Sequence, residues 1–186
     1  MAATVTIRRH TGVGGSQTKT DITSGNTRAS TSDAFNPGTS DPIPIPPSGS
    51  KYSYWVSTQL SADTTPAGTI DNIKWYSDGS NNFGTGVTVK GADASTGVDS
   101  GYRQAAGTPG DTGTELTQGN HTGLDSAPVD VFGLTSGSPK ALGGSIVNPS
   151  TGDFGDFFVY QIAVDNTASP GELPVDETFT FKYDET

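Results

Sequence analysis

Residues 157–164 read Phe-Phe-Val-Tyr-Gln-Ile-Ala-Val, and residues 178–183 read Thr-Phe-Thr-Phe-Lys-Tyr. The second stretch alternates strictly between aromatic and polar side chains, which is typical of a strand with one buried face. The first stretch is apolar on both faces, which predicts a strand that is central in its sheet or covered by another layer. Turn formers between them, namely Asn166, Pro170-Gly171 and Pro174, predict that the two strands pair with each other in antiparallel fashion.

Further strands are predicted upstream of this pair, because short alternating stretches are separated by turn residues such as those at 66–68 and 78–82. The stretches are residues 52–60, 69–76, 83–89, 129–134 and 141–147. No stretch of ten residues has the period of an amphipathic helix. The sequence therefore predicts an all-β fold, an antiparallel β-sandwich of immunoglobulin-like or jelly-roll-like form with an extended N-terminal arm and long loops.

The predicted organisation is an extended N-terminal arm over residues 1–50 and a β-sandwich body over residues 51–186. The arm begins with a short strand candidate at Thr4–Arg9 and ends in a proline-rich segment, where alternating prolines favour extended backbone around Ile43 and Ile45. The body contains a polar excursion over residues 91–128, whose large apolar residues are few: Val98, Tyr102, Leu116 and Leu124. An excursion of this length is expected to lie over the surface as an ordered loop.

The composition predicts a thin hydrophobic core. Leu, Ile, Val and Phe make up 34 of the 186 residues, which is close to the level found in disordered chains. The net charge is only −10, however, and the apolar residues cluster in alternating runs, so global disorder is rejected. A core this small indicates that contacts with other subunits or partners add to the stability of the fold.

Charge and residue usage exclude several classes of protein. Residues 1–34 carry a balance of +2 and the remainder −12, and an acidic body argues against binding to nucleic acid. No apolar run is long enough to cross a bilayer, and the first residues do not read as a secretory signal. The chain has no cysteine, so neither disulfides nor thiolate metal sites are expected.

No arrangement of residues predicts catalysis, so no catalytic residue, cofactor or metal ligand is assigned. The two histidines, His10 and His121, lie outside any nucleophile motif or metal-ligand spacing. The carboxylate pairs 153/156 and 176/177 sit among turn residues, where aspartate usually caps or turns the chain. Loop oxygens at 78–82 and 153/156 do not match a calcium-binding motif, and the sequence leaves open whether a calcium ion is bound.

Aromatic residues at strand spacing raise a carbohydrate-binding alternative. The candidates for a sugar-stacking platform are Tyr52, Tyr54, Trp55, Trp75 and Tyr76. Aromatic residues spaced in this way more often form the core between two sheets. Since adjacent residues of a strand point to opposite faces, only one of Tyr54 and Trp55 is expected in that core, and the other is expected to be exposed or covered by an arm or partner.

The closing residues resemble the ends of small β-sandwich virion proteins of tailed bacteriophages and related archaeal viruses. The resemblance lies in residues 157–164, in the Thr167-Ala168-Ser169-Pro170-Gly171 loop, and in the Thr/Phe strand that ends in Tyr183-Asp184-Glu185. It implies a capsid decoration protein or another structural protein of the virion head or tail, assembled in the host cytoplasm and located in the virion. The alternative is a cell-surface or carbohydrate-binding β-sandwich module, and an enzyme ranks last.

The predicted mode of attachment runs through the arm. We expect the arm to bind the major capsid protein, another virion protein or a neighbouring copy in a homo-oligomer, with a trimer as one candidate, and neither nucleic acid nor membrane. The partner-binding residues are expected to be apolar or basic side chains of the arm: Val5, Ile7, Arg8, Arg9, Ile43 and Ile45.

Overall fold

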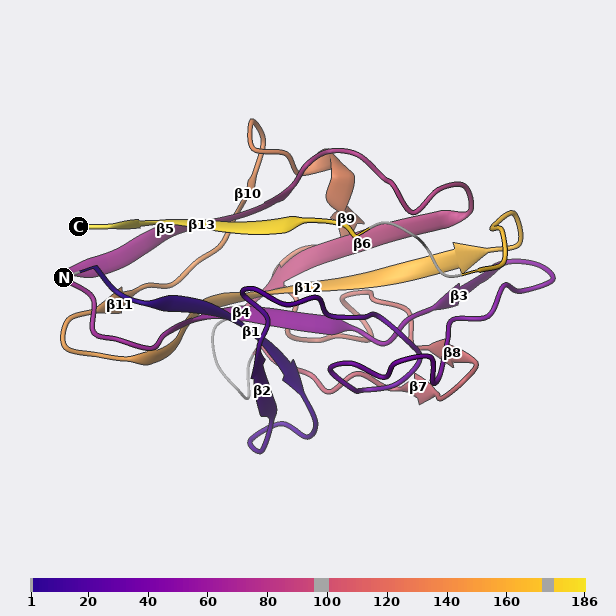
Figure 1. The fold of residues 1–186 in the computed structure, drawn as a ribbon, viewed down its shortest axis with the longest axis horizontal. Helices are drawn as coiled ribbons and strands as arrows, with labels where there is room; N and C mark the ends of the chain where they lie inside the picture. The colour runs from indigo at the N-terminus through magenta and orange to yellow at the C-terminus, as the bar shows by residue number, and fades with distance from the viewer. Residues whose placement is uncertain (1, 96–100, 172–175) are drawn as a thin grey trace.

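The computed structural model describes residues 2–95, 101–171 and 176–186, which form two antiparallel sheets packed face to face (Figure 1). We call them the large sheet and the small sheet. Within the described residues the large sheet has seven strands in the order β2-β1-β4-β12-β6-β9, with β3 beside one end of β12. Its strands are β1 (Val5–Thr11), β2 (Thr18–Asp21), β3 (Ser50–Tyr52), β4 (Val56–Ala62), β6 (Val87–Ala94), β9 (Val129–Asp130) and β12 (Gly152–Asp165).

The small sheet is built on one long strand, β5 (Thr69–Ser77). Along one edge of β5 lie two short strands, β10 (Lys140–Ala141) and β11 (Ile146–Val147), and β13 (Phe179–Glu185) also pairs with β5. A separate hairpin is formed by β7 (Gly107–Thr108) and β8 (Thr112–Gly113), and a 3-10 helix, η1, spans Val131–Gly133. The prediction of an all-β antiparallel sandwich is confirmed.

The first hydrophobic core lies between the two sheets. Trp75 of β5 stacks on Phe158 of β12 with ring centroids 3.7 Å apart, and Phe179 meets the edge of Tyr160 at 5.1 Å. Gly91 on β6 leaves room for this stack, because a Cβ atom there would lie 2.7 Å from the Phe158 ring. Trp75 therefore belongs to the inter-sheet core, as the spacing of aromatic residues predicted.

The predicted pairing of residues 157–164 with residues 178–183 is wrong. The first stretch lies in β12, which pairs with β3, β4 and β6, and the second lies in β13, which pairs with β5 of the other sheet. The two stretches therefore belong to different sheets. Alternation correctly indicated which side chains face inward, but these side chains meet across the sandwich and do not meet along a shared edge.

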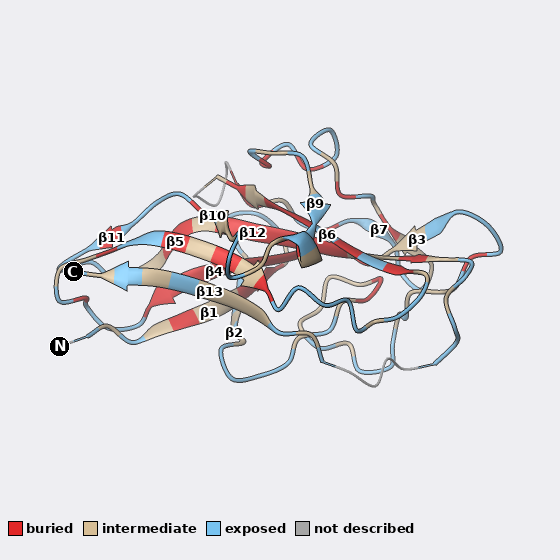
Figure 2. Cartoon of the chain, turned by 90° about the horizontal axis from the view of Figure 1, so that it is seen from above, coloured by how far each residue is buried: buried red, intermediate tan, exposed pale blue. Residues whose placement is uncertain are grey.

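A second hydrophobic core covers the other face of the large sheet, where residues 101–128 fold over β6 and β12. Tyr102, Leu116 and Leu124 are buried there against Phe157 and Val159 of β12. Figure 2 shows this burial of the large sheet: β4, β6 and β12 are largely buried, whereas β13 of the small sheet is intermediate or exposed. The excursion expected at 91–128 begins later, since β6 continues to Ala94, and Val98 and Pro174 lie outside the described residues.

Both Tyr54 and Trp55 are buried, with 6% and 5% of their surface exposed, and both belong to the second core. The indole Nε1 of Trp55 donates to Thr114 O at 2.9 Å, and its ring lies 4.8 Å from that of His121. The expectation that only one of the two could be in a core assumed an unbroken strand. Residues 53–55 lie between β3 and β4 and are not in a strand, so they do not alternate.

The N-terminal residues do not stand away from the body as an extended arm. β1 pairs with β4 from Val5↔Ala62 to His10↔Ser57, so it is an inner strand of the large sheet, with β2 beside it. Residues 22–49 form loops that are tied to the body, for example by Tyr54 N donating to Ser30 O at 2.7 Å. The strand candidate at Thr4–Arg9 was recognised, but its partner β4 could not be read from the sequence.

Candidate functional site

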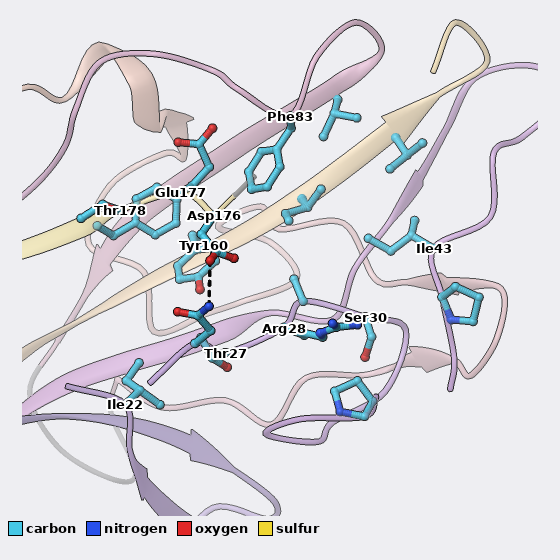
Figure 3. Close-up of a pocket in the computed structure, with 18 of the residues that line it drawn as sticks. Ile22, Thr27, Arg28, Ser30, Ile43, Phe83, Tyr160, Asp176, Glu177 and Thr178 are labelled. Carbon is cyan, nitrogen blue, oxygen red and sulfur yellow. Dashed lines mark hydrogen bonds between the residues drawn. The ribbon is translucent and has the colours of Figure 1, made fainter. Parts of the chain in front are cut away.

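A cavity of about 1000 Å³ lies between the two sheets, and we call it the seam cavity (Figure 3). It forms because the small sheet covers only part of the large sheet. Loop residues 22–30, 37–45, 168–171 and 176–178 surround the remaining space. A volume of this size is typical of a binding site for a small molecule or for the side chains of a partner.

The walls that the two sheets contribute to the seam cavity are largely apolar. The large sheet contributes Ile7, Val87, Tyr160, Ile162 and Val164. The small sheet contributes Trp75, Phe179 and Phe181. Burial raises the pKa of the Tyr160 hydroxyl, so this group is neutral. These sheet walls therefore offer apolar surface and a neutral hydroxyl, which suit an apolar occupant, while the charged lining groups come from the loops.

Polar and charged groups of the loops also line the seam cavity. Asn26 Nδ2 donates to Asp176 Oδ2 at 2.9 Å, which links the loop after β2 to the residues before β13 (Figure 3). Next to it, Glu177 Oε1 accepts from the backbone N–H of Asn82 at 2.6 Å. Arg28 also lines the cavity and donates to Gly38 O at 3.3 Å. The lining of the seam cavity thus includes two carboxylates and one guanidinium.

Ile7, Ile43 and Ile45, three of the six predicted partner-binding residues, line the seam cavity. Ile45 is the most accessible of them, with 37% of its surface exposed. Val5 instead packs against the inter-sheet core. The structure therefore brings the two isoleucines of the proline-rich segment together with an isoleucine of β1, although the three are far apart in the sequence.

The two arginines of β1 make contacts within the chain. Arg8 forms an ion pair with Asp63 at 2.7 Å. Arg9 is 1% exposed, and its Nη1 donates to Thr27 Oγ1 at 2.5 Å, Arg28 O at 2.7 Å and Phe35 O at 3.0 Å. Burial lowers the pKa of Arg9. Arg9 therefore holds the loop wall of the seam cavity, and a role for it at a partner surface is corrected because its side chain is not accessible.

Replacing Arg9 with methionine should destabilise the protein by about 2 kcal/mol, because the carbonyl oxygens of Arg28 and Phe35 lose a buried donor. The loss should appear as a lower midpoint in urea unfolding and as faster proteolysis within residues 27–36. Arg103→Met is the control, because Arg103 lies in residues 101–128, which cover the second core. This variant should leave the rate of proteolysis within residues 27–36 unchanged. A variant with wild-type stability and proteolysis would show that Arg9 does not hold this wall.

The candidate acidic sites act as parts of turns and ion pairs. Asp78 Oδ1 accepts from Ser80 N at 2.9 Å, Asp153 pairs with Lys19 Nζ at 2.5 Å, and Asp156 accepts from Gly143 N at 2.7 Å. Among the residues that the structure describes, no group of three or more His, Cys, Asp or Glu side chains could hold a metal ion. No helix in this part of the chain is long and apolar enough to cross a membrane.

The proposed sugar-stacking platform is not an exposed surface. Tyr54 and Trp55 are buried in the second core and Trp75 in the first, and Tyr52 and Tyr76 are half-buried. Trp75 reaches the seam cavity, together with Tyr160, Phe179 and Phe181. These four residues could not be predicted as cavity residues. An aromatic side chain that faces the other sheet gives the same alternating sequence pattern whether it packs in a filled core or borders an open cavity.

Searches of known protein families, curated proteins and solved structures find no match to this chain. The chain is therefore classified from its own structure: it is an all-β sandwich with a cavity between its two sheets.

Proposed function

We propose that the chain is a structural protein of a virus particle, of the capsid-decoration type, and that it attaches through the seam cavity. The resemblance of residues 157–185 to small virion sandwich proteins supports the class, and the low content of large aliphatic residues supports a protein that works in contact with others. The attachment differs from the expected free arm, because residues 5–11 are part of the large sheet.

The observation that carries the proposal is the apolar surface that the two sheets give to a cavity lined also by Ile43 and Ile45, of which Ile45 is 37% exposed. We infer that the occupant is an extended segment of the major capsid protein with apolar side chains at alternate positions. Such a segment places every second side chain on one face, so two or three of them enter the cavity together. Asp176 and Glu177 in the lining, and the net charge of −10, favour lysine or arginine beside those apolar residues.

The experiment measures binding of the purified chain to particles assembled from the major capsid protein that is encoded with it. Ile45→Glu should weaken binding about 100-fold, because it places a charge against the apolar wall that the segment covers. Val147→Glu is the matched control, since Val147 is 50% exposed on β11 and does not line the cavity. Both variants should unfold at the wild-type urea concentration.

Two results would overturn the proposal. One is particle binding by Ile45→Glu at wild-type affinity, which would remove the seam cavity from attachment. The other is binding of wild-type protein to defined glycans and not to particles, with the glycan binding lost in Ile45→Glu. That second result would favour the carbohydrate-binding alternative, in which a sugar ring stacks on the aromatic side chains of the cavity.

A further inference from the structure

The outer edge of β13 has no strand partner among the described residues. β13 pairs with β5 along one edge only, and it ends the small sheet on the side opposite β10 and β11. An unpaired strand edge presents a row of backbone N–H and C=O groups, which readily accepts another strand. β13, drawn in yellow in Figure 1, is extended over seven residues from Phe179 to Glu185.

The direction of the free backbone groups follows from one printed pair. Thr69 N donates to Thr186 O at 3.0 Å and Thr186 N donates to Thr69 O at 2.9 Å, so the groups of Thr186 point toward β5. Because these directions alternate along a strand, the N–H and C=O groups of Phe181, Tyr183 and Glu185 point away from β5. The register shift between Lys182 and Asp184 places its extra residue in β5, so β13 itself stays regular.

The charges of β13 complement those of a second copy of the same strand. Lys182 and Asp184 lie on the solvent face and are exposed, with Tyr183 between them on the inner face. In an antiparallel pair centred on Tyr183, each Lys182 lies opposite Asp184 of the other copy, which gives two ion pairs. In this register Tyr183 of each copy lies opposite Tyr183 of the other, at a position where the two residues exchange backbone hydrogen bonds. The same register therefore forms both the ion pairs and the backbone hydrogen bonds.

We propose that two copies of this chain associate through β13, in an antiparallel register centred on Tyr183, and so join their small sheets into one continuous sheet. A two-fold axis at Tyr183 makes the contact isologous, which closes the assembly at two copies. A single lysine on an edge strand discourages pairing, but here Asp184 of the second copy neutralises it. The proposal does not depend on attachment to a capsid, because it uses the backbone edge of β13 and not the lining of the seam cavity.

The chain offers a direct cross-linking test, because it contains no cysteine. In the proposed register the two Cα atoms at position 183 are about 5.5 Å apart, which is within the range that a disulfide bridges. Tyr183→Cys should therefore oxidise to a covalent dimer at twice the chain mass of 19.1 kDa. Val147→Cys, exposed on β11 at the far edge of the small sheet, should remain largely monomeric under the same conditions.

Charge reversal tests the register without changing the inner face. Sedimentation at about 100 µM chain, where an association of micromolar Kd is nearly complete, should show a dimer for the wild type. Lys182→Asp places two aspartate pairs in contact and should weaken the association at least about tenfold. The double exchange Lys182→Asp with Asp184→Lys restores both ion pairs and should restore the dimer. Lys90→Asp, the same charge change on β6, should leave it unchanged.

Two outcomes would overturn the proposal. A wild-type chain that is monomeric at this concentration, with Tyr183→Cys cross-linking no faster than Val147→Cys, would show that β13 is not a pairing edge. A dimer that responds equally to Lys182→Asp and Lys90→Asp would place the contact elsewhere. Asp184 also accepts from Asn72 Nδ2 at 2.6 Å, so the thermal unfolding of each variant is compared first to confirm that β13 is still paired with β5.

Discussion

Acidification from pH 7 to pH 5 should cost the protein about 2 kcal/mol of stability for each of its two histidines. His10 is 2% exposed and His121 is fully buried, and neither ring nitrogen of either residue has a hydrogen-bond partner among the described residues. Burial lowers the pKa of each from 6.5 to about 4. Around His10, Asp153 opposes this shift while Lys19 and Arg8 add to it, and around His121 Arg103 adds to it.

The direction of the effect follows from which state binds the proton. Between pH 6.5 and pH 4 the histidines of the unfolded chain become protonated while the buried ones stay neutral, so stability falls as the pH falls. The loss reaches about 3 kcal/mol per histidine at pH 4 and then levels off below the folded pKa. Urea unfolding at pH 7, 5 and 4 measures this loss.

The double variant His10→Phe with His121→Leu provides the comparison. It removes both titrating groups, so its stability should fall by about 4 kcal/mol less than that of the wild type between pH 7 and pH 5. His10 lies 5.0 Å from the ring of Phe157 and His121 lies 4.8 Å from Trp55, so apolar side chains suit both places. Parallel pH profiles for the two proteins would show that the histidines do not control acid stability.

Gln161→Met should destabilise the protein by about 3 kcal/mol. Gln161 is the one polar residue within the apolar run of β12, and only 3% of it is exposed. Its Oε1 accepts from Leu116 N at 2.7 Å, and its Nε2 donates to Ser53 O at 2.7 Å and Thr114 O at 2.8 Å. Methionine fills the same volume but leaves the Leu116 N–H and the Ser53 carbonyl buried without their partner.

The loss should be concentrated in the layer that covers the second core. Hydrogen exchange within residues 101–128 should accelerate in Gln161→Met, while exchange in β5 should change only as much as overall stability requires. Gln104→Met is the matched control, since Gln104 is exposed and, within the described residues, its side chain bonds Asp33 alone, at the surface, and it should cost less than about 0.5 kcal/mol. Equal stability of the two variants would contradict the role assigned to Gln161.

The sequence was sufficient to predict the fold class and the inward faces of its strands, but it could not predict which strands pair. Alternation in residues 178–183 reports burial on one side, and burial is the same whether the neighbouring strand is β12 or β5. The apolar second face of β12 was recognised, and residues 101–128 supply its cover. Gln161 was passed over because a single amide in an apolar run shows no sign of its partners, which lie 45 and 108 residues away.

The seam cavity could be predicted only in part. Ile43 and Ile45 were singled out because the prolines around them leave no local core, and both line the cavity. Arg9 was assigned to a partner surface because it lies in the weakly basic N-terminal stretch, and only the folded loop shows the acceptors that enclose it. Trp75 and Tyr160 carry no sequence signal that separates a cavity wall from a filled core, since the difference depends on how far the small sheet extends.

The layer over the second core has one more consequence. With packing on both of its sides, the large sheet has few exposed residues along its central strands β4 and β12. We therefore expect replacements to be tolerated mainly at the outward residues of the small sheet, such as Lys74 and Thr180, at the exposed positions of β2, β6 and β9, and at the tips of turns. A designer who wishes to graft a new epitope onto the molecule has the same limited area to use.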